Sequence, residues 1–170
     1  MNNKLWIVLA LCALATACRE VPVVEVESPT ADPLKEQMIG ANRLIAQSEE
    51  SLIDAYVERR GWQMRRLSDG VRVMETDASQ PRGAAIGYDD TVAITYSVEA
   101  LNGSTVYSMQ YDTVTVGRLK PNRGIDAALR TLHRGSQARI ILPSEQAYGV
   151  VGDGARIGSR MVLVYDLKVE

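Results

Sequence analysis

A tyrosine lies in a glycine-rich loop near the carboxyl end of the chain, in the stretch "LPSEQAYGVVGDG" from Leu142 to Gly154. Aromatic residues in loops are either anchors packed on the body of a domain or the polar-tipped wall of a pocket. Tyr148 stands between the small residues Ala147 and Gly149, where packing has little need of a ring. We therefore favour a pocket wall over an anchor.

The residue types that support covalent or metal chemistry are scarce. His133 is the one histidine, and the two cysteines, Cys12 and Cys18, stand near the amino end. This excludes histidine–cysteine and paired-histidine zinc sites, and it disfavours a Ser-His-Asp triad, which would have to use His133. The sequence also has no Walker loop and no GxGxxG before a helix. We expect neither a metal nor a cofactor, so an enzymatic reaction here must need no nucleophile.

Rotation about an X-Pro peptide bond meets that condition. The barrier of roughly 18–20 kcal/mol comes from amide resonance, and no covalent intermediate is needed to cross it. A dry concave pocket for the proline ring, with one or two hydrogen bonds that favour the twisted amide, would suffice. Phenylalanine is absent, so tyrosine and tryptophan must build any aromatic pocket.

Composition fits an ordinary soluble domain with additional segments. The chain has 170 residues, 46% of them hydrophobic and 24% charged. The formal net charge is −2 and no lysine or arginine run stands out, so nucleic acid is not expected as a partner.

The first residues are typical of an export signal. Lys4 is followed by an apolar run, Leu5 to Ala17, that is too short as a helix for the roughly 30 Å hydrocarbon core. Small residues then lead into Cys18, an arrangement that resembles the lipobox of bacterial lipoproteins. The resemblance implies a signal peptide over 1–17 and a lipid on Cys18. An ordinary secretory signal is the alternative.

The location follows from the same resemblance. A lipid anchor on Cys18 implies a chain held at a membrane of the cell envelope and facing the periplasm. Arg19 gives no aspartate-type cue for retention at the inner membrane, which favours the outer membrane.

A tether and a helical arm are predicted next. Residues 18–32 contain two prolines and scattered acids without a helical period, which indicates a tether. Asp32 and Pro33 suit a helix start and Gly61 a helix end, so we predict an arm over 33–61. Its expected apolar face consists of Leu34, Met38, Ala41, Ile45, Leu52 and Tyr56.

The remainder, residues 62–170, alternates like antiparallel strands. Asn102-Gly103 is the strongest hairpin signal, and Ser68 to Gly70 predicts another turn. We expect "STVYSM" and "TVTV" to be separate strands, and one short helix to run from Ile125 towards Gly135. Five or more antiparallel strands with a single internal helix predict an α+β domain.

The order of these features resembles the FKBP-type peptidyl-prolyl isomerases over roughly 92–170. The most telling stretches are "ILPSEQAYG" and "LVYDLKV". The resemblance implies a curved antiparallel sheet wrapped around one short helix, with a proline pocket between them and an arm in front. The arm, "ERRGW" and Cys18 further resemble FKBP-type lipoproteins associated with bacterial gliding motility.

The resemblance also implies roles for individual residues. Tyr148 would offer its hydroxyl to a substrate carbonyl, and the backbone N–H of Asn122 would bind the substrate. Tyr96 would wall the pocket, and Ser108 occupies the position of a pocket aspartate. The remaining substrate-binding positions implied are Tyr107, Pro121, Ile125, Ile157 and Tyr165.

Three residues depart from the family pattern. Ser108 replaces the aspartate, Asp112 falls where an aromatic is common, and Ile125 replaces a tryptophan. These departures leave two hypotheses open. One is a membrane-anchored isomerase that helps exported proteins to fold, with proline-containing polypeptides as clients. The other is a weakly active or inactive peptide-binding or assembly module. A second copy of the chain is a further expected partner, bound through the arm.

Overall fold

The structure is a computed structural model that describes residues 33–77 and 83–170. The chain divides into two compact units, residues 1–37 and 38–170, and only residues 33–37 of the first are described. The predicted signal peptide, the tether and Cys18 lie outside the described residues. Along the part that is described, no helix has both the length and the apolar character needed to cross a membrane.

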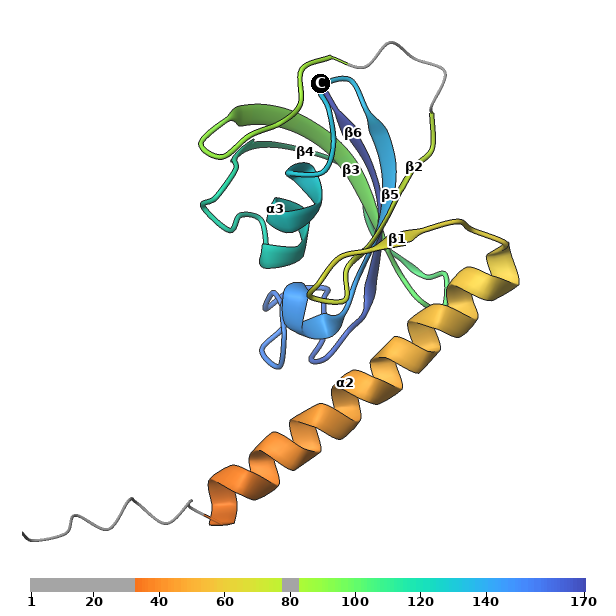
Figure 1. Cartoon of the computed structure of the whole chain (residues 1–170), viewed down its shortest axis with the longest axis vertical. Helices are drawn as coiled ribbons and strands as arrows, with labels where there is room; N and C mark the ends of the chain where they lie inside the picture. The colour runs from red at the N-terminus through yellow and green to blue at the C-terminus, as the bar shows by residue number, and fades with distance from the viewer. Residues whose placement is uncertain (1–32, 78–82) are drawn as a thin grey trace, which may run out of the picture. The chain divides into compact units, whose positions relative to one another are not determined.

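One sheet of six antiparallel strands forms the centre of the larger unit (Figure 1). Its strand order is β1-β2-β5-β6-β3-β4. The bounds are β1 Arg65–Arg66, β2 Arg72–Glu75, β3 Thr91–Ala100, β4 Thr105–Thr115, β5 Gln137–Leu142 and β6 Leu163–Val169. This curved sheet with one short helix against it confirms the predicted α+β fold.

The β3–β4 hairpin turns at the predicted Asn102-Gly103. Gly103 has φ 83°, which glycine adopts without steric cost, and Asn102 Oδ1 accepts a hydrogen bond from the Ser104 N–H. The prediction of two separate strands after this turn was wrong, because β4 is continuous from 105 to 115. An irregularity in the pairing opposite Ser97, with Met109 at φ 50°, divides the alternation and explains the apparent break.

The single helix within the domain, α3, spans Arg123–Leu129. It ends earlier than predicted, because the chain passes into turns after Leu129. Ile125 and Leu129 are fully buried against the β3–β6 strands, so α3 packs on one face of the curved sheet (Figure 1). The main core therefore lies between α3 and the sheet.

The arm forms the helix α2, Pro33–Arg60. Ile53 and Tyr56 are buried with Ile141 of β5 and Val164 of β6 in a second apolar cluster. Successive residues of a strand point to opposite faces of the sheet. Ile140 therefore belongs to the main core and its neighbour Ile141 to the second cluster, on the other face. The second half of α2 therefore covers the face of the sheet opposite α3.

The predicted apolar face of α2 was largely wrong. Leu34, Met38 and Leu52 are all more than half exposed, whereas the buried side consists of Glu49, Ile53 and Tyr56. The spacing of apolar residues along a long helix does not determine which of them pack against the rest of the protein. In α2, the buried Glu49 occupies one of the packing positions.

Candidate active site

A hollow of about 270 Å³ opens on the α3 side of the sheet. This volume lies near the lower end for small-molecule pockets and suits a small ring. The lining residues come from β3, β4, β6 and the loop after the short 3-10 turn η1, Ser144–Gln146. They are Tyr96, Val98, Tyr107, Gln110, Tyr148, Asp153 and Tyr165.

Tyr165 forms the floor of the hollow. Its side chain is 1% exposed, and its ring lies 5.6 Å from that of Tyr96 at a tilt of 40°. Burial raises the pKa of the Tyr165 hydroxyl well above its ordinary value, and the neighbouring Tyr148 adds to the effect. The phenol therefore stays neutral, and the floor of the hollow carries no charge.

Asn122 holds this floor to α3. It is the N-cap of the helix: its Oδ1 accepts a hydrogen bond from the Ile125 N–H at 2.9 Å. Its Nδ2 donates to the Tyr165 hydroxyl at 3.2 Å. The side chain is thus committed to fixing the helix and the floor together, while the role predicted for its backbone N–H stays a prediction.

Tyr148 lines the hollow from the loop after η1 and packs partly on the core. The loop is closed on both sides: the Gly149 N–H donates to the Ser144 carbonyl at 2.7 Å, and the Arg160 N–H donates to the Gly149 carbonyl at 2.8 Å. Burial, followed by the nearby Tyr148, raises the pKa of Tyr96. The phenols of β3, β6 and this loop therefore face one space, as the pocket interpretation requires.

Asp153 is a lining residue that the sequence reasoning missed. Its carboxylate accepts a hydrogen bond from the Tyr107 hydroxyl at 2.5 Å and from the N–H groups of Ala155 and Ile157 at 2.8 Å. Burial alone would raise the pKa of Asp153, but these bonds outweigh it and lower the pKa to about 2. The signal in the sequence was an aspartate between two loop glycines, Gly152 and Gly154.

Ser108 is not brought to the hollow. Its side chain is exposed, because the irregularity in β4 places Ser108 and Met109 together between two lining residues, Tyr107 and Gln110. The carboxylate at the Tyr107 wall is instead that of Asp153, from a different loop. Downstream of the irregularity, Asp112 is half-buried and raises the pKa of Tyr96 as a lesser cause after burial and Tyr148.

The other predicted positions lie behind or beside the hollow. Ile125 is fully buried and Ile157 is 4% exposed, and both belong to the apolar cluster that also contains Tyr165. Pro121 is half-buried and directly precedes the Asn122 cap. Within 33–77 and 83–170, no group of three or more histidine, cysteine, aspartate or glutamate side chains could hold a metal ion.

Comparison with known proteins places the domain in a class. The family model of the FKBP-type peptidyl-prolyl cis-trans isomerases matches residues 83–170, which contain every residue that lines the hollow. The chain therefore belongs to this family, and it is an isomerase of X-Pro peptide bonds.

A solved structure supports the same fold. It is described as a peptidyl-prolyl cis-trans isomerase from Pseudomonas syringae pv. tomato, and it is similar with a TM-score of 0.57 and 22% sequence identity. The match covers 75% of this chain and 92% of that one. None of the curated proteins matches this chain. The likeness to gliding-motility lipoproteins stays a prediction.

Proposed function

We propose that the tyrosine-walled hollow is the isomerase site and that the protein works as a lipid-anchored folding helper for exported polypeptides. The assignment of the hollow as the isomerase site rests on one observation. Four tyrosines line this small hollow together: Tyr96, Tyr107, Tyr148 and Tyr165. These residues come from β3, β4, β6 and the loop after η1.

The proposed mechanism uses shape and hydrogen bonds. The prolyl ring enters the hollow beside Tyr96 and over Tyr165, and the ring itself displaces water from them. The hydroxyl of half-buried Tyr148, which neighbours that of Tyr165, donates to a substrate carbonyl. A dry pocket favours the twisted amide, which has lost resonance, over the planar and better-solvated one. Each 1.4 kcal/mol of such preference, about the value of one hydrogen bond, accelerates rotation roughly tenfold.

Asp153 supports activity over the binding-only alternative. The alternative arose in part because Ser108 cannot supply a carboxylate to the wall of the pocket. Asp153 supplies one, and its bond to Tyr107 holds the β4 wall and the loop together. The departure at Ser108 is thereby compensated by a residue elsewhere in the chain.

A protease-coupled isomerisation assay on proline peptides tests the activity. The parent protein should accelerate cis-to-trans conversion in proportion to its concentration, and the heat-unfolded protein should not. Peptide binding by a folded parent without acceleration would favour the binding module and overturn the proposal.

The membrane anchor is a separate part of the proposal. It rests on the resemblance of the residues around Cys18 to a lipobox and on the proline-rich tether after it. More than one acyl chain on Cys18 would give durable attachment, where a single chain would be marginal. The net charge of −2 and the acidic arm give no second attraction to anionic lipid.

Cys18→Ser tests the anchor. On phase separation of a detergent extract, the parent should enter the detergent phase and Cys18→Ser the aqueous phase. The intact mass of the parent should include acyl chains that the variant lacks. Aqueous partition of both proteins would instead support an ordinary secretory signal.

A further inference from the structure

A buried carboxylate of α2 reaches the loop that carries Tyr148. Glu49 is 7% exposed, although a charged side chain is rarely buried without partners. Its two oxygens accept hydrogen bonds from the Ser144 N–H at 2.9 Å and from Ser144 Oγ at 2.6 Å. Both are charge-assisted bonds to a single residue, so the contact is specific in position as well as favourable.

Ser144 is in turn the closing point of the Tyr148 loop. Its carbonyl accepts hydrogen bonds from the Ala147 N–H at 3.1 Å and from the Gly149 N–H at 2.7 Å. Those two donors flank Tyr148 on either side. The position of the Tyr148 backbone therefore follows the position of Ser144.

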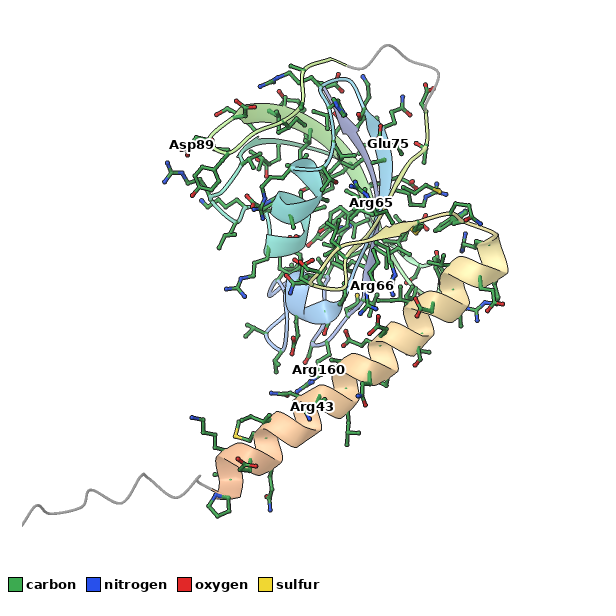
Figure 2. The ribbon with its side chains drawn as sticks, viewed as in Figure 1. Arg43, Arg65, Arg66, Glu75, Asp89 and Arg160 are labelled. Atoms are coloured by element: carbon green, nitrogen blue, oxygen red, sulfur yellow. The ribbon has the colours of Figure 1, made fainter. Side chains whose placement is uncertain are left out.

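The part of α2 that carries Glu49 is held to the sheet by other contacts. The next turns of α2 pack through Ile53 and Tyr56 on the sheet. On the other side, Arg72 of β2 is buried and donates to Glu50 and Asp54 of α2 at 3.2 and 2.6 Å. Arg66 of β1, which Figure 2 labels, also pairs with Glu50, at 2.5 Å. The helix is thus fixed to the strands independently of its contact with Ser144.

We propose that Glu49 is a positioning residue for catalysis, which makes the helical arm a working part of the isomerase. The family match begins at residue 83, so Glu49 comes from a segment outside it. The inference rests on the proposed role of Tyr148. Glu49 acts through Ser144: it sets the place from which the Tyr148 hydroxyl meets the substrate carbonyl.

Three variants separate this role from a general effect on folding. Glu49→Ala removes both acceptors, Glu49→Gln keeps one acceptor oxygen, and Ile53→Ala loosens α2 without touching Ser144. Assayed well below their melting temperatures, Glu49→Ala should lose at most what removal of the Tyr148 hydroxyl loses in kcat/KM, about threefold to tenfold. Glu49→Gln should recover part of the loss, and Ile53→Ala should stay within about twofold of the parent, since a position that acts only on stability leaves the folded site intact.

Combination with Tyr148→Phe gives the decisive result. If Glu49 acts through the Tyr148 hydroxyl, Glu49→Ala should cost little in a Tyr148→Phe background, because the group that it positions is gone. Equal losses in both backgrounds, or equal losses in Glu49→Ala and Ile53→Ala, would overturn the inference.

Amide hydrogen exchange keeps this test apart from the proposed function. Relative to the amides of β5 and β6, exchange at the Ser144 and Gly149 amides should become faster in Glu49→Ala and not in Ile53→Ala. Unchanged exchange would overturn the inference even in an active protein. A parent without activity would overturn the proposed function, and the inference with it, even where exchange at these amides responds as expected.

Discussion

At the residue scale, the site combines neutral phenols with one carboxylate that stays charged. Burial raises the pKa values of Tyr165 and Tyr96, so both phenols stay neutral. Asp153 is ionised across the ordinary pH range because donors surround it. Its hydrogen bond also raises the pKa of Tyr107. The hydrogen bond between Asp153 and Tyr107 therefore favours a charged carboxylate and a neutral phenol at the same time.

Asp153→Asn should reveal its contribution to stability through pH. The folded pKa is lowered from 3.8 to about 2, so the stabilisation is present above pH 3.8 and is lost as the pH falls towards about 2. The melting temperature of the variant should lie below that of the parent at pH 7, and the difference should shrink over this acidic window. A difference that is constant down to pH 2 would contradict the assigned hydrogen bonds.

The sequence singled out one lining residue of the hollow and missed another. Tyr148 could be picked out because small residues flank it in a loop. Ser108 was misplaced because the irregularity in β4 shifts the alternation by one residue, and irregularities of this kind leave no clear pattern in a single strand. Asp153 reaches Tyr107 across 46 positions of sequence, and only the folded loop brings the two together.

At the element scale, the strands and turns of the domain were predictable and the packing of α2 was not. Alternation along β3 and β6 and the Asn102-Gly103 turn follow local rules that hold in the structure. The face of α2 that makes contact depends instead on which residues β5 and β6 present on the outer side of the sheet. The sequence of the helix alone carries no information about those residues. The buried acid of α2, Glu49, looked in the sequence like an ordinary exposed one.

Ile53→Ala should measure how firmly α2 is held. Ile53 is 1% exposed, and removing a buried side chain of this size costs about 2–5 kcal/mol of unfolding free energy. Urea denaturation of the full chain measures the loss. Leu44→Ala is the matched control, because Leu44 of the same helix is 69% exposed, is not among the residues of the dimer seam proposed below, and should cost less than about 1 kcal/mol. Equal losses would contradict the assigned face of the helix.

At the scale of the whole molecule, the exposed side of α2 is where a second copy is expected. Met38 and Leu52 are each 59% exposed and stand a whole number of heptads apart, with half-buried Ile45 midway between them. Apolar residues repeating in this way suit a helix–helix seam. We propose a homodimer formed along this side.

Sedimentation of the full chain tests the dimer. Replacing Met38 and Leu52 together by glutamate should convert the dimer into a monomer, since like charges would then face each other across the seam. The exposed control Val151→Glu should leave the dimer intact, because Val151 lies in the loop after Tyr148. A parent that already sediments as a monomer at micromolar concentration would contradict the proposal.

The most direct test of the central claim is the kcat/KM of Tyr148→Phe on a proline peptide, measured by exchange NMR beside the parent. Loss of one neutral hydrogen bond to the substrate should lower kcat/KM by roughly threefold to tenfold. Tyr88→Phe, at a 67% exposed tyrosine outside the hollow, should match the parent. A Tyr148→Phe protein as active as Tyr88→Phe would show that the Tyr148 hydroxyl takes no part in the reaction.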